Sequence, residues 1–139
     1  MPADFFIDAQ RRMVFSKATG VVCWDDVVDH MDRLESHPDF RPEFNQLVDI
    51  REASRTDLSH NDVRRMAERR IFSDKSRRAF VVSRDFEFGL SRVFATYREI
   101  RGETGIEVFR DMKKALSWLS LTEEPDPGMF TRLKPSQVA

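Results

Sequence analysis

The sequence is poor in the residues that mark secreted, membrane-spanning or disulfide-bonded proteins. Its 139 residues include one cysteine, Cys23, which excludes an internal disulfide bond. No apolar run approaches the roughly 20 residues that a membrane-spanning helix needs, and residues 1–13 lack the apolar core of a signal peptide. We therefore expect a cytoplasmic protein with no membrane span.

The chain also lacks a charge excess of either sign. Twenty-three basic residues stand against 24 acidic residues, so the net charge is −1. Proteins that bind nucleic acid or an anionic membrane through their overall field carry a clear basic excess. We therefore expect no nucleic-acid partner, and we interpret the basic run at residues 64–78 as a solvated face.

Metal-ligand patterns are missing as well. His30, His37 and His60 are separated by 7 and 23 residues, which matches no Cys/His spacing of a zinc site. No combination of nucleophile, base and acid stands out along the chain. The sequence therefore predicts no metal, no cofactor and no enzymatic activity.

What the sequence does contain is the composition and the periodicity of one globular α/β domain. The hydrophobic fraction is 40%, and 12 phenylalanines argue against disorder. Short β-rich runs alternate with runs of helical period, in the order ββαβαβαβα. The expected strands are residues 4–8, 11–19, 45–50, 77–83 and 106–110. The expected helices are 24–36, 59–72, 88–100 and 111–120.

This order predicts a mostly parallel five-stranded sheet with one antiparallel strand at the N-terminus. Strands joined through helices pair in parallel, whereas the two residues between the first two strands indicate a hairpin. We expect a single domain over residues 1–120. Residues 121–139 carry three prolines and no periodicity, and we interpret them as a C-terminal tail that is flexible or docked through Met129, Phe130 and Leu133.

Five stretches of the sequence together resemble a known family. They are TGVVCWDDVVDHM, PDFRPEFNQLVDIREAS, LSHNDVRRM, RRAFVVSRDFEFGLSRVF and IEVFRDMKKALSWL. Over residues 3–120 the chain looks like the SpoIIAA-like group of bacterial STAS domains, the anti-sigma factor antagonists and their relatives. The resemblance implies a β-α superhelix with most helices on one side of the sheet. It also implies a binding module without catalysis, in an outline shared with lipid-binding domains of the Sec14 type.

The chain departs from the anti-sigma factor antagonists at their regulatory serine. Those proteins begin the helix after the third strand with Ser-Ser-Gly or Ser-Gly, whereas this chain has Ser59-His60-Asn61-Asp62 after a longer loop. Ser59 and Asp62 fit a helix capping box, which accounts for both residues without a signalling role. Ser59, and in the loop Ser54 and Thr56, are nevertheless the candidate phosphorylation sites.

The candidate binding residues gather around the end of the third expected strand. Asp49 lies near its carboxyl end, where α/β sheets place ligand crevices, and Arg51, Ser54 and Arg55 follow in the expected loop. Two aromatic residues, Phe86 and Phe88, stand at an expected loop-to-helix junction, where they could line an apolar pocket or a subunit contact.

Two binding functions remain open on the sequence. The first is a STAS-like module that binds a protein partner in bacterial regulation, and the second is a carrier of a small apolar ligand or lipid. A homodimer is also expected, because residues 79–82 are apolar on both faces and one face of the sheet would otherwise lie bare.

Overall fold

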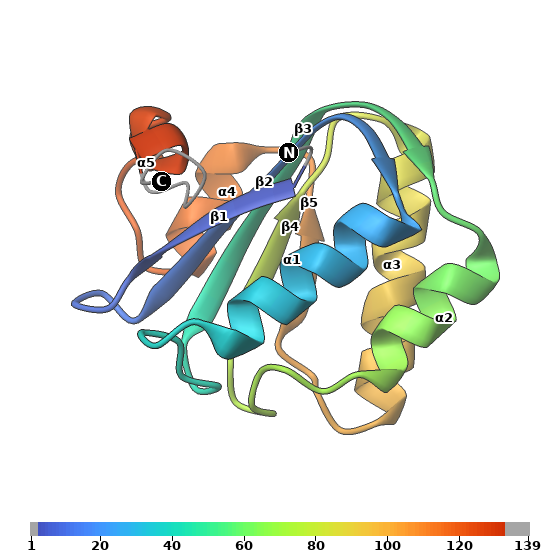
Figure 1. Ribbon diagram of the computed structural model, residues 1–139, viewed down its shortest axis with the longest axis horizontal. Helices are drawn as coiled ribbons and strands as arrows, with labels where there is room; N and C mark the ends of the chain where they lie inside the picture. Colours follow the sequence, from blue (N-terminus) through green and yellow to red (C-terminus); the bar gives the residue numbers. More distant parts are fainter. Residues whose placement is uncertain (1–2, 133–139) are drawn as a thin grey trace.

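The computed structural model describes residues 3–132. The strands are β1 (Ala3–Asp8), β2 (Met13–Cys23), β3 (Asn45–Asp57), β4 (Arg78–Val81) and β5 (Ile106–Phe109). The helices are α1 (Trp24–Ser36), α2 (His60–Glu68), α3 (Asp85–Ile100), α4 (Met112–Trp118) and α5 (Gly128–Arg132). The expected order ββαβαβαβα is confirmed, and α5 follows it (Figure 1).

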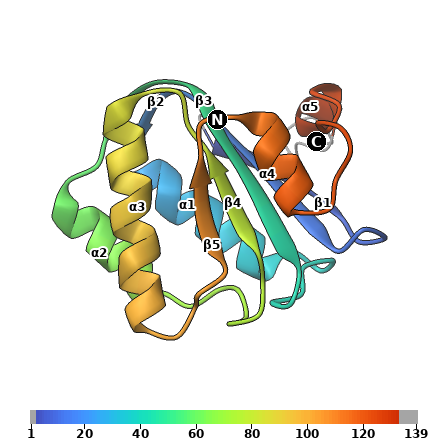
Figure 2. The ribbon, with the colours of Figure 1, turned by 180° about the vertical axis from the view of Figure 1, so that it is seen from behind.

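The five strands form one mixed sheet in the order β1-β2-β3-β4-β5, so that neighbours in sequence are neighbours in space. β1 pairs with β2 antiparallel, with Ala3 opposite Ala18 and Asp8 opposite Met13. The remaining pairs are parallel, and the view from behind shows β3, β4 and β5 running side by side (Figure 2). The expected mostly parallel sheet with one antiparallel strand is confirmed.

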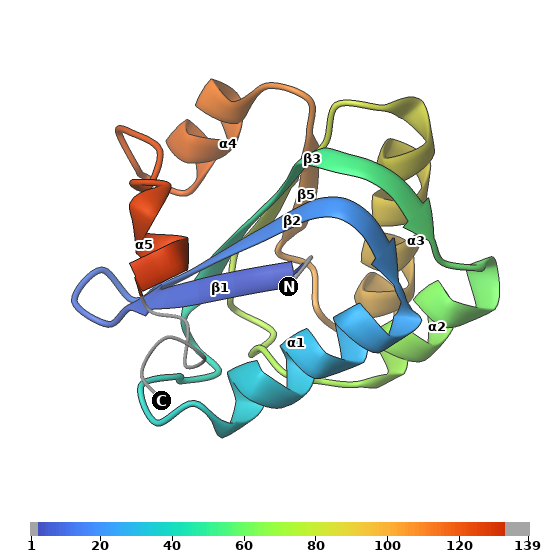
Figure 3. The ribbon, with the colours of Figure 1, turned by 45° about the horizontal axis from the view of Figure 1, so that its top comes forward.

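Helices cover both faces of this sheet. α1, α2 and α3 lie against one face, and α4 and α5 lie against the other (Figure 3). The bare face that motivated the homodimer is therefore covered within the chain. Ala79 and Val81 pack with Met112 and Leu116 of α4, and Val82 is fully buried. A homodimer stays a prediction, but this reason for it no longer holds.

Strict alternation along the strands gives the two faces different chemistry. The odd-numbered residues Phe15, Leu47 and Ala79 form the apolar layer under α4. The even-numbered residues Ser16 and Gln46 face α1–α3 and are buried although they are polar. The α1–α3 side of the sheet is thus the side where buried polar groups collect.

Two strand predictions were too short. β2 continues to Cys23 and β3 to Asp57, and their outer parts pair with each other through two register shifts. β4 pairs with β3 only as far as Asp49, so β2 and β3 extend past the sheet as a two-stranded arm. A strand that has one neighbouring strand and a solvent-exposed face needs few apolar residues. For this reason the sequence of residues 51–57 predicted a loop.

Other boundaries moved by a few residues. The first hairpin has a four-residue turn rather than two residues, closed by the Arg12 amide donating to the Ala9 carbonyl at 3.3 Å, with Arg12 at φ 58°. α2 ends at Glu68, not at residue 72, and Phe72 is buried in the segment that follows. α3 begins at Asp85, three residues earlier than the expected start at Phe88, and Arg84 is its N-cap residue.

Residues 121–132 pack on the sheet through α5. The Phe130 ring meets the Phe6 ring edge-on with centroids 4.9 Å apart, and Met129 packs against the same apolar cluster. Arg51 of β3 donates to the Glu124 carboxylate at 2.6 Å. Of the three residues expected to dock the tail, Leu133 lies outside the described residues.

Candidate functional site

A cavity of about 160 Å³ lies between the sheet and α1, α2 and α3, and we call it the inner cavity. Its apolar wall on the strands includes Val22, Val48, Ile50 and Phe80. Its apolar wall on the helices includes Val27, Met31, Leu34, Val63, Met66, Leu90 and Phe94. An engineered cavity of about 150 Å³ with a similar apolar lining stays dry and binds benzene. The inner cavity is therefore large enough for a small apolar molecule.

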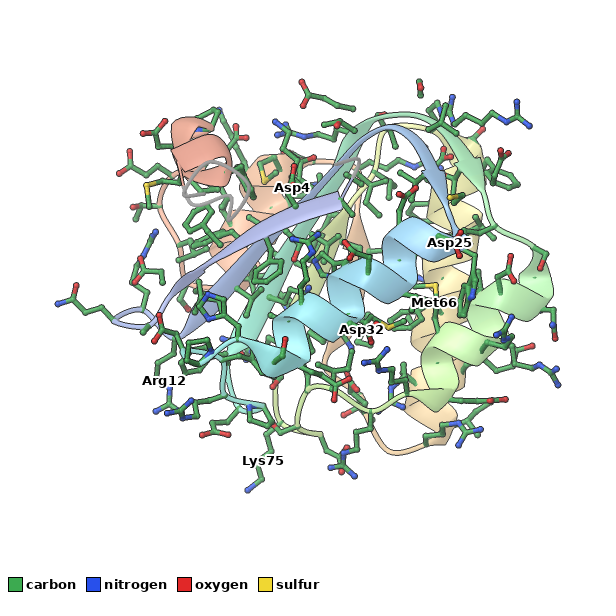
Figure 4. The ribbon with its side chains drawn as sticks, in the orientation of Figure 1. Asp4, Arg12, Asp25, Asp32, Met66 and Lys75 are labelled. Atoms are coloured by element: carbon green, nitrogen blue, oxygen red, sulfur yellow. The ribbon has the colours of Figure 1, made fainter. Side chains whose placement is uncertain are left out.

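The cavity exists because α1 packs on the sheet edge and does not pack closely on α2. α1 lies over β1 and β2, where Leu34 joins Val14 and Phe72 in one apolar cluster. α2 packs instead with α3 over β4, where Val63 and Phe94 belong to another cluster. Met66 on α2 points toward α1 across the space between the two helices (Figure 4).

Side chains rather than backbone packing connect α1 to α2. Arg69, directly after α2, donates to Glu35 at 2.6 Å and to Asp32 at 2.8 Å, both on α1. The Arg65 guanidinium lies 4.4 Å from the centre of the Trp24 ring at the start of α1. Acidic residues of α1 thus contact Arg69, which belongs to the basic run at residues 64–78. The basic run is therefore only partly a solvated face.

A chain of buried polar groups runs along the inner face of the sheet into the cavity wall. Ser16 of β2 hydrogen-bonds with His30 Nε2 at 3.0 Å and accepts from Gln46 Nε2 at 3.0 Å. Gln46 Oε1 accepts from Arg78 Nε at 3.0 Å, and Arg78 Nη1 donates to Glu103 at 2.8 Å. Four elements of the fold therefore place their polar groups in one connected line.

Glu103 connects this chain to a second arginine, Arg98, which is its last member. Arg98 of α3 donates to it through Nε at 3.0 Å and forms an ion pair through Nη2 at 2.8 Å. The Glu103 side chain is fully buried, whereas 3% of the Arg98 side chain and 10% of the Arg78 side chain are exposed. Burial lowers the pKa of Arg78, against the attraction of Glu103. One carboxylate thus faces two buried guanidinium groups.

A second buried carboxylate lies at the other end of the cavity wall. Arg84, the residue before α3, clamps Glu87 with Nε and Nη2 at 2.9 and 2.8 Å, which holds the pKa of Glu87 below its usual value. The buried Thr56 hydroxyl lies beside this carboxylate and helps to lower the same pKa. Thr56 Oγ1 is fully buried but forms no hydrogen bond of normal geometry with any of the described residues.

His30 faces the cavity and should respond to acid. Burial lowers its pKa from 6.5 to about 4, and Arg33 and Arg78 add to this effect. Because the unfolded chain binds the proton more tightly, stability is fully present above about pH 6.5 and falls as the pH drops toward about 4. We expect a loss of about 2 kcal/mol over this range, less than the full shift implies because the side chain is only partly buried by area.

The measurement is urea unfolding of the wild type and of His30→Gln at several pH values in this window. The free energy of unfolding of His30→Gln should fall less steeply with decreasing pH than that of the wild type. His60→Gln is the control and should keep the wild-type pH dependence, because His60 is exposed and hydrogen-bonds with the Tyr97 hydroxyl at 3.1 Å. If the free energy of unfolding of His30→Gln changes with pH as steeply as that of the wild type, another group causes the acid sensitivity.

Asp49 and Arg51, two of the residues predicted as a binding site, lie on the opposite face of the sheet. Asp49 is not at a strand end, because β3 continues for eight residues, but it stands level with Val81, the last residue of β4. It accepts two hydrogen bonds from the Arg51 guanidinium at 2.9 Å, which raises the pKa of Arg51. With Glu124 these residues border a separate hollow beside α5 that has both polar and apolar walls, and the Arg51–Glu124 ion pair connects the segment before α5 to β3.

The other predicted site residues do not come together. Ser54, Arg55 and Thr56 lie in β3 rather than in a loop, and Arg55 pairs with Asp57 at 2.6 Å. Phe86 and Phe88 are in the first turns of α3, not at a junction before it, and neither lines the inner cavity. Phe86 is 54% exposed, whereas the Arg110 guanidinium lies 4.3 Å from the centre of the Phe88 ring.

Ser59 caps α2 as the sequence predicts. Its hydroxyl accepts from the Asp62 amide at 3.0 Å, and the Asp62 carboxylate accepts from the Ser59 amide at 2.9 Å. Ser54 is exposed, whereas the Thr56 hydroxyl is buried. Phosphorylation of Ser54, Thr56 or Ser59 stays a prediction, and the burial of the Thr56 hydroxyl argues against that residue.

Sequence reasoning missed the buried polar chain. Two strands did carry a signal for it, because alternate residues of a strand point to the same face of the sheet. Gln46 therefore shares a face with the apolar Val48 and Ile50. Arg78 likewise shares a face with Phe80. Arg98 gave a similar signal in α3, because it lies four residues after Phe94 and eight after Leu90 on the apolar face of the helix. Glu103 gave none, because it lies between α3 and β5, where charged residues are ordinarily exposed.

Neither a metal cluster nor a membrane helix is found between residues 3 and 132. No group of three or more His, Cys, Asp or Glu side chains in this part of the chain could hold a metal ion. None of its helices combines the length and the apolar character needed to cross a bilayer.

Comparison with known proteins gives the fold but no relative in sequence. No protein-family model and no curated protein matches the chain. It is similar to the crystal structure of an uncharacterized protein from the DUF3478 family, with a SpoIIAA-like fold, from Shewanella loihica PV-4. The TM-score is 0.56 at 22% sequence identity, over 84% of this chain and 93% of that chain. The protein therefore has the SpoIIAA-like fold that the sequence resemblance predicted.

Proposed function

We propose that this protein binds a small apolar molecule in the inner cavity, as a carrier without catalytic activity of its own. The observation that carries the proposal is the cavity itself, about 160 Å³ with a mostly aliphatic and aromatic wall. Small-molecule sites are typically concave and apolar, with a few polar groups that fix the orientation of the ligand. The buried Ser16, Gln46 and Arg78 supply such groups.

The position of the cavity supports a carrier in a second way. Two of its three helical walls are α1 and α2, which Arg69 and Arg65 connect through side chains. Exposed ion pairs such as those of Arg69 contribute about 0–1 kcal/mol each, so they add little to the cost of separating the two helices. A ligand could therefore enter between α1 and α2 without disturbing the sheet.

Filling the cavity should abolish binding. Val48 lies on β3 and faces the cavity, so Val48→Phe places a ring where the ligand would lie. We expect binding of 1-hexanol, measured by isothermal titration calorimetry, to weaken at least about tenfold in this variant. The matched control is Val21→Phe on β2, where the side chain is 51% exposed and does not line the cavity.

Two outcomes would contradict the carrier. One is that the wild type binds no small apolar probe, neither hexanol nor the acid of the same chain length, hexanoate. The other is equal probe binding by the wild type and Val48→Phe. Native mass spectrometry of the purified protein provides a second readout, because a co-purifying small molecule should be present in the wild type and lost from Val48→Phe.

A protein partner in bacterial regulation is the second candidate. The feature in its favour is Phe86, a large aromatic side chain that is 54% exposed in the first turn of α3. Exposed aromatic residues are enriched at the centres of protein interfaces. A single exposed aromatic residue is weaker support for a protein partner than the inner cavity is for a carrier. Binding of a protein partner therefore stays a prediction.

A further inference from the structure

The buried chain beside the inner cavity carries more positive charge than negative charge. Arg78 and Arg98 are both buried, and Glu103 is the carboxylate that forms ion pairs with them. His30 adds no charge near neutral pH, because its pKa is lowered to about 4. Within the described residues the chain from His30 to Arg98 therefore holds a single uncompensated positive charge.

Within residues 3–132, Arg78 still has N–H groups that are free to donate hydrogen bonds. Its Nε donates to Gln46 and its Nη1 to Glu103, while its Nη2 has no hydrogen-bond partner among the described residues. Nη2 is also not a fully buried atom, and Arg78 is one of the residues that line the cavity. The N–H groups of Nη2 are therefore the donors that Arg78 can offer to a ligand in the cavity.

Aromatic rings hold this guanidinium in place. The Phe72 ring centre lies 4.3 Å from the Arg78 Cζ atom, and those of Phe94 and Phe80 lie 5.4 and 5.9 Å away. A guanidinium fixed in this way loses little further freedom when it binds an anion. Phe80 and Phe94 also form part of the apolar wall, so the charged group and the apolar surface are adjacent.

We propose that the ligand of the inner cavity is a small apolar acid whose carboxylate binds to Arg78 and whose hydrocarbon part lies against α1, α2 and α3. This inference rests on the proposed function and adds the chemical class of the ligand. A carboxylate carries one negative charge, which matches the single excess positive charge. Its oxygens accept the planar N–H groups of a guanidinium, and the resulting charge-assisted bonds are short and strong.

Charge and size argue against phosphate monoesters, amines and large ligands. A phosphate monoester carries nearly two negative charges at neutral pH and would leave an unpaired anion in an apolar site. An amine would add to the positive charge already buried there. A cavity that compares with one holding benzene accommodates a body of about six to eight heavy atoms, the size of hexanoate.

The test compares two probes of equal chain length, hexanoate and 1-hexanol, by isothermal titration calorimetry on the full chain. Because the hydrogen bond from Arg78 to hexanoate is charge-assisted and shielded from water, the wild type should bind hexanoate about 10- to 100-fold more tightly than hexanol. Equal affinities for the acid and the alcohol would overturn the inference and leave the carrier standing. Failure of both probes to bind would overturn the carrier as well.

Arg78→Met should remove the preference for the acid. This variant leaves Arg98 and Glu103 as a neutral pair, so it should fold. It should bind hexanoate no more tightly than hexanol, because the carboxylate would then have no counterion in an apolar site. The control is Arg77→Met, one residue earlier, whose guanidinium donates to the Trp118 carbonyl at 2.9 Å and does not line the cavity. A persistent preference in Arg78→Met would overturn the assignment of the carboxylate to Arg78, and if that variant does not fold, the wild-type comparison alone decides.

Discussion

Replacement of Glu103 by glutamine is expected to lower the free energy of unfolding by about 3–5 kcal/mol, the typical cost of removing one partner from a buried ion pair. The Glu103 side chain is fully buried and accepts from Arg78 at 2.8 Å and from Arg98 at 3.0 Å. Without the carboxylate, two guanidinium groups would remain buried with no counterion in this chain of contacts. Urea unfolding followed by circular dichroism would measure the loss.

Two variants distinguish this explanation from a general sensitivity to lost carboxylates. Glu124→Gln removes a carboxylate that pairs with Arg51 at the surface, and it should change stability by no more than about 1 kcal/mol. Adding Arg78→Met to Glu103→Gln should recover part of the lost stability, because one buried cation then remains instead of two. A Glu103→Gln protein that unfolds at the wild-type urea concentration would contradict the argument.

Gly105→Ala is expected to destabilise the fold by about 3 kcal/mol, which corresponds to a fall of about 10 °C in the melting temperature. Gly105 lies directly before β5, and its carbonyl accepts from the Arg78 amide at 2.8 Å. An added Cβ would lie 2.1 Å from the Ser76 carbonyl oxygen and 3.2 Å from the Ser76 carbonyl carbon. Both atoms belong to the backbone, so the start of β5 would have to move away from β4.

Gly89→Ala is the matched control. Gly89 lies in α3, and a Cβ built there would meet nothing within 4 Å. Alanine favours the helix over glycine by about 1 kcal/mol, so this variant should be slightly more stable than the wild type. Differential scanning calorimetry of both variants gives the comparison. Equal melting temperatures for Gly105→Ala and the wild type would show that the backbone at Ser76 yields easily.

The sequence could predict the elements because each has its own periodic signal. The apolar residues from Trp24 to Leu34 recur at helical spacing, and the structure has α1 at Trp24–Ser36. The boundaries failed where tertiary pairing replaces local signal. Residues 51–57 are mostly polar, yet they belong to a strand because β2 pairs with β3 from Glu52 to Asp57.

The candidate site was largely beyond prediction because it depends on contacts between distant residues. Asp49 was a reasonable first choice by position, but its carboxylate is engaged by Arg51 on the face of the sheet that α4 and α5 cover. The cavity lies on the other face, and its polar wall joins Ser16, Gln46 and Arg78 from three strands.

By itself, the sequence determined the order of strands and helices, the mostly parallel sheet and the capped start of α2, because these follow from periodicity and from side chains within a few residues of each other. The tertiary structure alone decided which face of each helix meets which face of the sheet. It thereby left the inner cavity between α1 and α2 and brought Arg78, Arg98 and Glu103 together. Charge pairing and cavity shape are properties of residues far apart in the chain, so only the folded arrangement defines them.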